Sequence, residues 1–331
     1  MEQLTPRENF IRFFKNEPVQ WTPSSRDLLR FNPSLIPENM ARGMVNESGH
    51  FTDDQFGGKD FFGVPWVYVP AERGSIEVPG YVMMDDISDW RDYVTFPDLS
   101  KLDWEGCAKE NQAYLTTDKM IDSTIFTGYF ERLISFLGFE DAAVAMIDPD
   151  VEDDVRELFD KLTDFYIDLI RHYHTYFNTE HIYFHDDWGS QKSTFFSVDT
   201  HRELIVPCIK RIVEAAHEMG VYVEMHSCGC IGTLVPNMIE AGLDSWRGQP
   251  VVNDKPALVR EYGDRFKFGV EIVAPSDHAP SDEEADAIVQ EFIDEYKGAN
   301  IWIALTRGFT DKQMQDMFDK IYREFGQDCP Y

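Results

Sequence analysis

The hydrophobic and polar positions of the chain become regular from about residue 120 onward. Short apolar runs typical of buried strands alternate there with longer segments whose apolar residues recur every three or four positions, as on one face of a helix. The pattern predicts strands at 124–127, 182–185, 221–226, 245–246, 266–270 and 301–305, and helices at 151–177, 202–219, 231–241, 256–262, 281–296 and 311–325.

This alternation of strands and helices predicts the fold class. Strands joined through helices usually lie parallel, because the crossover helix returns the chain to the same edge of the sheet. The sequence contains no glycine-rich nucleotide-binding motif and no GxSxG motif that would favour a doubly wound sheet. We therefore expect an α/β protein with a (β/α)8 TIM barrel, a fold that accommodates a chain of this length in one domain.

The first third of the chain has a different pattern. Thr5, followed by Pro6 and an early acidic residue, predicts the start of a helix. Residues 18–105 are irregular and rich in proline, glycine and aromatic residues, which is typical of an extension or lid that lines a pocket, or of a loop-rich segment held to the body by its aromatics. The expected boundaries within a single barrel domain, 1–331, are about 1–115 for the N-terminal helix and extension and about 116–331 for the main barrel body.

Polar side chains follow the predicted strands at their carboxyl ends. In α/β barrels the chemistry lies at that edge, in the loops that follow the strands. The strand ends therefore predict an active site there. The strings concerned are HDDWGSQ at 185–191, HSCG at 226–229, WRGQ at 246–249, Glu271, and TRG at 306–308.

The segment 221–231, VYVEMHSCGCI, carries the strongest chemical signal. Glu224, His226, Cys228 and Cys230 occupy alternate positions, and alternate side chains of an extended strand point to the same side. Carboxylate, imidazole and thiolate groups are ligands of zinc. The pattern predicts a zinc site that includes His226 and Cys228. The alternative is a barrel strand with one packed histidine and two small, buried cysteines.

Two neighbouring aspartates follow the predicted strand at 182–185. Asp187 is a candidate for a general acid, for a group that binds a substrate hydroxyl, or for one that orients a metal ligand. The alternative for Asp186 and Asp187 is that they cap a loop or helix. We expect His185, which precedes them, to face the opposite side of its strand and to have a structural role.

Composition and charge restrict the class of partner. The net charge of −30, from 60 acidic and 30 basic residues, repels phosphate backbones, so nucleic acid is not expected as a partner. The five cysteines, an odd number with two close together, are typical of free thiols in a reducing compartment. The N-terminal segment has the pattern of an amphipathic helix rather than a signal peptide, and no apolar run approaches the roughly 18 residues needed to span a bilayer. We therefore expect a cytoplasmic protein that does not bind membranes.

Several short strings together resemble the uroporphyrinogen decarboxylase superfamily. Within it, the chain looks like the branch of corrinoid-dependent methyltransferases that act in methanol, methylamine, chloromethane and aryl-ether demethylating systems. Each string alone is weak, but their order and spacing extend over most of the chain. They are DFFGVPW at 60–66, DW at 89–90, FPD at 96–98, GYFERL at 128–133, FHDDWGSQ at 184–191, HSCG at 226–229, EAGLD at 240–244 and LVREYGDRFKF at 258–268.

The resemblance implies a (β/α)8 barrel that holds zinc through a His-x-Cys pair and a second cysteine several dozen residues later. His226 and Cys228 match the pair. The strand end at 301–308, IWIALTRG, has no cysteine, so the third ligand departs from the pattern of the family. The candidates for it are Glu224, which strand alternation favours, Cys230, Asp187 or another carboxylate; the remaining alternative is a site without zinc.

The resemblance also implies methyl transfer. A methyl ether reacts with a Co(I) nucleophile only when its oxygen is polarised or protonated, and zinc can polarise it as a Lewis acid. A carboxylate in place of a thiolate would leave the metal more electrophilic, which favours an ether donor over a thiol acceptor. We therefore expect an O-demethylase-type methyltransferase that moves a methyl group from a small methoxy compound, aromatic or not, to a separate corrinoid protein. That protein would supply the cobalamin, because this sequence lacks an Asp-x-His-x-x-Gly string.

Other functions remain open at this point. The first is methyl transfer from a methylcorrinoid to a thiol, and the second is decarboxylation of a porphyrinogen, although 19–30 lacks the arginine motif of that branch. The others are a metal-free lyase or hydrolase with a carboxylate pair and a non-catalytic relative that binds a corrinoid protein. Exposed aromatics are compatible with a homodimer. The candidate catalytic residues are Asp187 and Glu224, and the candidate substrate-binding residues are Trp66, Tyr129, Gln191, Trp246 and Gln249.

Overall fold

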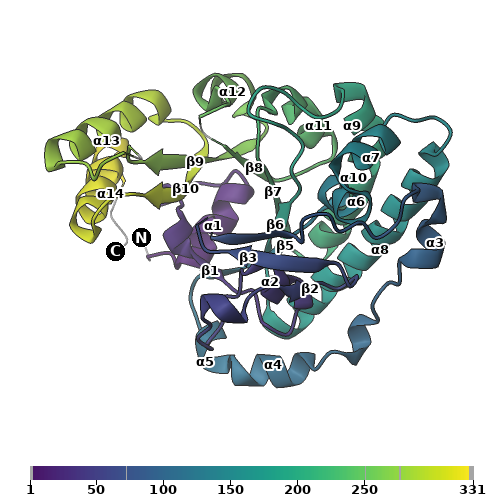
Figure 1. Ribbon diagram of the computed structural model, residues 1–331. Coiled ribbons are helices and arrows are strands. Elements are labelled where there is room, and N and C mark those ends of the chain that lie inside the picture. The colour runs from purple at the N-terminus through teal and green to yellow at the C-terminus, as the bar shows by residue number, and fades with distance from the viewer. Residues whose placement is uncertain (1–2, 72, 250, 276, 328–331) are drawn as a thin grey trace. The chain divides into compact units, whose positions relative to one another are not determined.

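The computed structural model describes residues 3–71, 73–249, 251–275 and 277–327 (Figure 1). The described chain divides into two compact units. The central unit comprises 29–117 and 121–243, and the C-terminal unit comprises 244 onward together with 118–120 and the N-terminal segment as far as Leu28. Each unit is described by itself, and the expected boundary near residue 115 stays a prediction.

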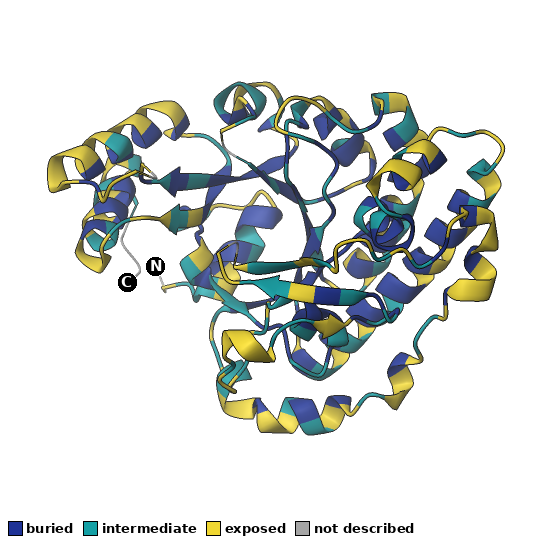
Figure 2. Cartoon of the chain, viewed as in Figure 1, coloured by how far each residue is buried: buried dark blue, intermediate teal, exposed yellow. Residues whose placement is uncertain are grey.

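The central unit contains parallel strands with helical connections. Strand β6 (His181–His185) pairs in parallel with both β5 (Met120–Ile125) and β7 (Tyr222–Ser227), and β1 (Leu28–Arg30) lies beside β5. Strands β5, β6 and β7 are largely buried, as the dark blue ribbons in Figure 2 show. The helices that connect them are α6 (Tyr129–Leu137), α7 (Phe139–Ala145), α8 (Glu152–Phe177), α9 (Val198–Leu204) and α10 (Val206–Glu218), and β7 is followed by η5 (Gly232–Leu234) and α11 (Val235–Glu240).

The C-terminal unit repeats the same alternation. Strand β9 (Lys267–Val273) pairs in parallel with β8 (Ser245–Gly248) and β10 (Ile301–Arg307). The helices of this unit are α1 (Pro6–Phe14), α12 (Lys255–Tyr262), α13 (Asp282–Tyr296) and α14 (Asp311–Phe325), with the short helix η1 (Ser25–Asp27). The predicted mixed α/β class with parallel strands is therefore confirmed, and the alternation fits a TIM-barrel-like fold. Closure into a full (β/α)8 barrel stays a prediction.

One predicted helix is in fact two. The segment 202–219 belongs to α9 and α10, which are separated at Ile205. Pro207 lies in the first turn of α10, where its missing N–H leaves no helical hydrogen bond unmade. The short helices α6 and α7 were not predicted from the sequence.

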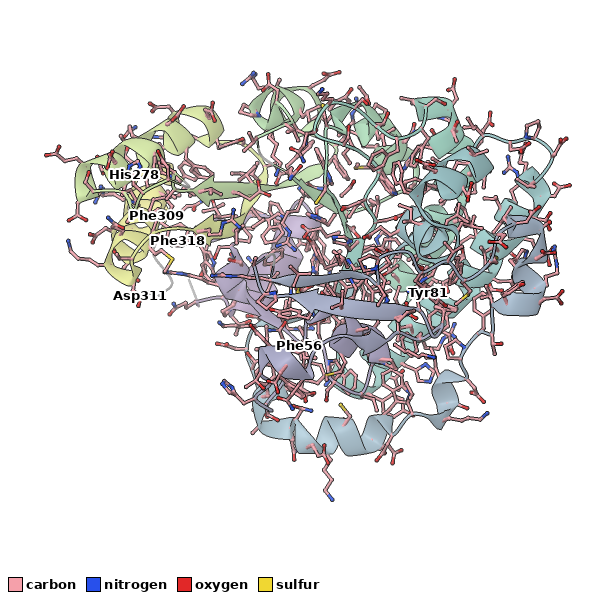
Figure 3. The ribbon with its side chains drawn as sticks, in the orientation of Figure 1. Phe56, Tyr81, His278, Phe309, Asp311 and Phe318 are labelled. Carbon is pink, nitrogen blue, oxygen red and sulfur yellow. The ribbon has the colours of Figure 1, made fainter. Side chains whose placement is uncertain are left out.

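The prediction that residues 18–105 are irregular is wrong in part. The segment contains a three-stranded antiparallel sheet in which β3 (Pro65–Val69) pairs with β2 (Gly58–Lys59) and β4 (Gly74–Glu77). Its aromatics pack among themselves: the ring centroid of Phe56 (labelled in Figure 3) lies 5.2 Å from that of Tyr68. The remaining elements of residues 29–117 are α2 (Pro37–Arg42), η2 (Asp53–Gln55), η3 (Ile87–Asp89), α3 (Trp90–Tyr93), η4 (Leu99–Lys101), α4 (Trp104–Glu110) and α5 (Gln112–Leu115).

The helices have no membrane-spanning character. Among the residues that the structure describes, no helix combines the length and the apolar composition required to cross a bilayer.

Candidate metal centre

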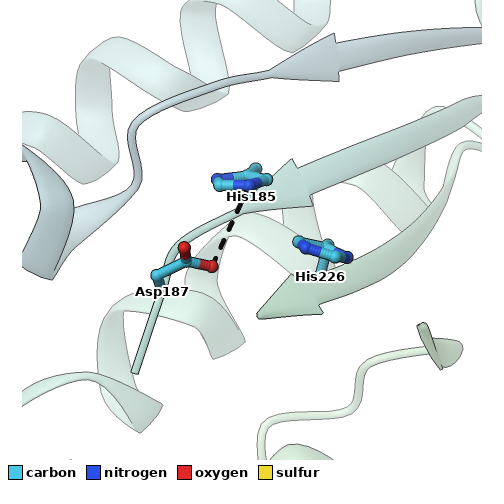
Figure 4. Close-up of side chains that lie close together, drawn as sticks. All are labelled: His185, Asp187 and His226. Atoms are coloured by element: carbon cyan, nitrogen blue, oxygen red, sulfur yellow. Dashed lines mark ion pairs between the residues drawn. The ribbon is translucent and has the colours of Figure 1, made fainter. Parts of the chain in front are cut away.

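Two histidines lie side by side where β6 and β7 end. His185 is the last residue of β6, and the parallel register pairs it with His226 of β7. Side chains at paired positions of neighbouring parallel strands lie next to each other on the same face. The two imidazole rings accordingly stack, with their centroids 4.8 Å apart and their planes 20° from parallel (Figure 4).

Asp187 completes a group of three possible metal ligands. His185, Asp187 and His226 each offer a ligand atom, and these atoms all lie within 4.8 Å of one another. The Nε2 atom of His185 is 3.9 Å from Oδ1 of Asp187 (Figure 4). All three side chains are half-buried, so a ligand can reach them from solvent. Among the described residues, this is the group in which His, Cys, Asp and Glu side chains converge in this way.

Cys228 adjoins this group on the side of His226. Its Sγ atom is 3.6 Å from Nε2 of His226, and its backbone N–H donates to Oδ1 of Asp187 over 2.6 Å. With Zn–N near 2.0 Å and Zn–S near 2.3 Å at a tetrahedral angle, two zinc ligands of these types lie roughly 3.6 Å apart. Without a metal, the same contact is a weak S–H···N hydrogen bond. The spacing of this one pair therefore matches that of two zinc ligands, while the three residues whose ligand atoms all converge are His185, Asp187 and His226.

The protonation of these groups follows from burial and neighbouring charge. Burial, together with the charge of Asp187, raises the pKa of Cys228 to about 12, so the metal-free thiol is protonated at neutral pH. Burial also raises the pKa of Asp187. Burial opposes the charged form of His185, but the Glu131 carboxylate outweighs it and raises the pKa of the ring. A bound cation would displace the thiol proton, because the thiolate is the form that binds metal.

A glutamate and an arginine support His185 from behind. Nδ1 of His185 lies 2.6 Å from Oε2 of Glu131, and Nη2 of Arg42 donates to Oε1 of the same carboxylate over 3.4 Å. Burial raises the pKa of Glu131, but the charges of His185 and Arg42 outweigh it and lower the pKa to about 2. Glu131 is therefore a carboxylate that accepts a hydrogen bond on each oxygen.

Asp186 caps a helix, which was the structural one of the two roles that the sequence left open for it. Its buried carboxylate accepts from the backbone N–H groups of Tyr129, Phe130 and Glu131 at the first turn of α6, and from the indole N–H of Trp188. It thus caps a helix that lies earlier in the chain. A Cβ atom at position 128 would lie 2.5 Å from the Cβ of Asp186, so Gly128 allows this close approach.

Glu224 and Cys230, two of the candidate third ligands, lie outside the group. Glu224 is fully buried within β7, two residues before His226, and its carboxylate is not among the converging ligand atoms. Cys230 is half-buried, and its backbone N–H donates to the carbonyl of Ser190. The geometry therefore favours Asp187 as the third ligand.

Two of the five candidate substrate-binding residues are buried within the central unit. Tyr129 is fully buried and its hydroxyl is hydrogen-bonded to Thr163, which indicates a structural role. Trp66 is also buried, and its indole N–H donates to Asp60. Gln191 is exposed in the loop after β6. Trp246, which is buried in β8, and Gln249, which is half-buried after it, belong to the C-terminal unit.

Three residues of the site were missed or misassigned from the sequence. We expected His185 to face the opposite side of its strand, but its ring stacks on that of His226 and lies near Asp187. Alternation itself places residues two apart, such as His185 and Asp187, on the same side. The pairing of His185 with His226 would have been the better guide, but it requires the strand register. The position of Glu131 after a strand end was a signal for the mouth of the barrel, but its pairing with Arg42 gave none, because the two residues are 89 apart in the chain.

Gly229, next to Cys228, is expected to be indispensable for the loop. Its φ is +88°, and a Cβ atom there would lie 2.2 Å from the carbonyl oxygen of Gly189. Strain and overlap each cost about 1 to 3 kcal/mol, so Gly229→Ala should lower the free energy of unfolding by about 2 to 6 kcal/mol. Gly220→Ala is the matched control, since Gly220 has φ +76° and nothing within 4 Å of the added atom. Urea unfolding of both variants separates the cost of backbone strain from the cost of overlap. Equal losses of unfolding free energy in the two variants would contradict the close approach of Gly229 to Gly189.

Comparison with known proteins supports the fold. No protein-family model and no curated protein matches the sequence. Among solved structures, a methyltransferase from Methanosarcina mazei matches with a TM-score of 0.62 and 12% identity over 98% of this chain and 99% of its own. A D-psicose 3-epimerase from Clostridium cellulolyticum H10 matches with a TM-score of 0.38 and 10% identity, over 73% of this chain and 88% of its own. An AP endonuclease of family 2 from Brucella melitensis matches with a TM-score of 0.36 and 10% identity, over 66% of this chain and 83% of its own. The last two scores are too low to carry an argument, whereas the first shows that this chain shares its fold with a methyltransferase.

Proposed function

We propose that this protein is a zinc-dependent, corrinoid-dependent methyltransferase of the O-demethylase type. It would take a methyl group from a small methoxy compound and pass it to a separate corrinoid protein. The observation that carries the proposal is the spacing of 3.6 Å between His226 Nε2 and Cys228 Sγ, beside the converging His185 and Asp187. The fold shared with a methyltransferase and the resemblance to the uroporphyrinogen decarboxylase superfamily agree with it.

The residues present fit a catalytic zinc ion. His226, Cys228 and Asp187 would hold it, and three protein ligands leave a position for a substrate oxygen, as in other catalytic zinc sites. When bound, the zinc would act as a Lewis acid on the ether oxygen. The carboxylate of Asp187 takes the place of the second cysteine that the resemblance implies, and this harder ligand set suits an oxygen substrate better than a thiol.

His185 is the group that we assign to proton transfer. In the proposed reaction, the bond between the methyl carbon and the ether oxygen would break, the methyl group would pass to the corrinoid of the partner protein, and the oxygen would take up a proton and leave as an alcohol or phenol. Nε2 of His185 faces Asp187 at 3.9 Å, while Nδ1 is engaged by Glu131. In the protonated ring, which the Glu131 carboxylate favours, Nε2 carries a second proton that it can deliver beside the proposed zinc ligands, and the neutral Nδ1–H ring remains.

A methyl-transfer assay tests this function. The zinc-loaded protein is mixed with chemically reduced cobalamin and a panel of aromatic and aliphatic methoxy compounds, and methylation of the cobalt is followed by its absorbance. We expect transfer from at least one donor and none with the metal-free protein. Transfer from methylcobalamin to a thiol, without transfer from any ether, would instead support the methylcorrinoid:thiol alternative. No transfer in either direction would contradict the proposal.

A further inference from the structure

The hydrogen bonds around His185 distinguish its two ring nitrogens. A carboxylate can only accept hydrogen bonds, so the contact of 2.6 Å to Glu131 Oε2 requires the proton on Nδ1. In the neutral ring this leaves the lone pair on Nε2, which faces Asp187. The stacking on His226 fixes the plane of the ring. The surroundings thus determine both the orientation of His185 and its tautomer.

Glu131 is in turn held by Arg42, the last residue of α2. One guanidinium nitrogen donates to Glu131 and the other to Oγ1 of Thr127, over 2.7 Å. The guanidinium carbon lies 4.5 Å from the centroid of the Trp66 ring, in β3. A planar fork of donors can make both hydrogen bonds at once, which a lysine cannot reproduce in the same geometry.

The backbone at Thr127 shows how closely this arrangement is specified. Thr127 is fully buried with φ +61°, a conformation that is strained for a β-branched residue. Its hydroxyl donates to Glu38 of α2 over 2.5 Å and accepts from Arg42, and its carbonyl accepts from the hydroxyl of Tyr166. Such strain persists only where the surrounding contacts determine the conformation.

We propose that Glu131, held by Arg42, is the positioning residue that directs Nε2 of His185 toward the reacting group. The α2 segment, expected from the sequence to be a lid or a packed extension, then supplies part of the support of the site. This inference deepens the proposed function, and it rests on that function for its catalytic meaning. The histidine tautomer, in contrast, can be tested in the metal-free protein.

Glu131→Gln is the most informative substitution, because it keeps the shape of the side chain. Arg42 can only donate, so it will retain the amide oxygen, and the amide nitrogen will then face His185. The ring must accept at Nδ1 and carry its proton on Nε2. Selective ¹⁵N-histidine labelling, with His185 assigned by loss of its signal in His185→Gln, reports this tautomer by NMR at a pH at which the ring is neutral. We expect the Nδ1–H form in the parent protein and the Nε2–H form in the variant.

The kinetic consequence is expected in turnover rather than in binding of the methyl donor. Loss of an orienting partner of this kind typically reduces activity by about 10- to 100-fold. We expect kcat for methyl transfer to fall by that factor, with KM changed by less than about threefold, and the loss to disappear when His185 is already replaced. Arg42→Lys should give a smaller loss in the same direction. Glu152→Gln, in the first turn of α8, is the control for loss of an acidic residue at a helix start, and should leave tautomer and kcat unchanged.

The outcomes separate this inference from the proposed function. If Glu131→Gln keeps the Nδ1–H tautomer while remaining folded, the positioning role is overturned, whatever the activity. If the tautomer changes but the parent protein neither binds zinc nor transfers methyl groups, the positioning role stands and the proposed function fails. If Glu131→Gln does not fold, the tautomer in Arg42→Lys decides, because that variant keeps the Glu131 carboxylate; a mixture of tautomers supports the proposal, and an unchanged Nδ1–H form overturns it.

Discussion

Replacing His226 by alanine is expected to abolish zinc binding and to slow methyl transfer by about a thousandfold. The imidazole lies close to Cys228 and belongs to the converging group with His185 and Asp187. A Lewis acid contributes several kcal/mol to stabilisation of the transition state, and each 1.4 kcal/mol corresponds to about a tenfold change in rate. Zinc per chain, measured by inductively coupled plasma mass spectrometry, should fall from about one to near zero.

His217→Ala is the matched control for this experiment. His217 is exposed near the end of α10 and lies outside the converging group. It should therefore keep both zinc and activity. A His226→Ala protein that retains stoichiometric zinc would place the metal elsewhere, and the assignment of the centre would be wrong.

Arg132→Met is expected to lower the free energy of unfolding by about 3 to 5 kcal/mol. Arg132 is 1% exposed in α6, and its guanidinium bonds Glu38 at 2.8 Å and Asp60 at 2.5 Å. Removing the cation leaves two carboxylates buried beside each other, and breaking a buried pair in this way is strongly destabilising. The measurement is the midpoint and slope of urea unfolding, followed by circular dichroism.

The control for Arg132 is an arginine on the surface. Arg202 bonds Glu240 at 2.9 Å, but both side chains are about half exposed, so Arg202→Met should change stability by less than about 1 kcal/mol. A loss below 1 kcal/mol in Arg132→Met as well would show that water or protonation of Glu38 compensates the buried charges. Burial raises the pKa of Glu38 to about 7. Protonation of Glu38 is therefore the specific way in which the protein could compensate the loss of Arg132.

The regular elements after residue 120 could be predicted because local signals agree with tertiary burial. Helices α13 and α14 begin at capping boxes formed by Ser281 with Glu284 and Thr310 with Gln313, and their apolar faces repeat with the helical period. Strands β6 and β10 each contain a short, continuous apolar run, as expected for strands covered on both faces. Each of these signals is contained within a few consecutive residues of the sequence.

The segment before residue 115 could not be predicted in the same way. Strand β2 has only two residues, too few for an alternating pattern, and the contacts that hold the segment to α6 join residues far apart in the chain, such as Arg132 to Asp60 and Glu38. No local pattern reports such pairs. Of the two roles expected for the aromatics of the segment, the packing of Phe62 on Phe136 and Phe165 agrees with the one in which they hold the segment to the body.

The candidate site was predictable only where its residues follow one another. His226 and Cys228 are two residues apart at the end of β7, so their spacing alone predicted a metal site. Glu224 shares that alternation, but strand alternation fixes only the side of the sheet and not the distance to the strand end. His185 and Asp187 come to His226 through the pairing of β6 with β7, which a single sequence does not reveal.

X-ray absorption at the zinc edge of the zinc-loaded protein tests the central assignment most directly. The proposed ligands predict one zinc per chain, with one sulfur near 2.3 Å and the remaining neighbours nitrogen or oxygen near 2.0 Å. In Cys228→Ser the sulfur contribution should disappear while nitrogen and oxygen neighbours remain. A protein that takes up no zinc, or a first shell with no sulfur or with two or more, would contradict the centre formed by His226, Cys228 and Asp187.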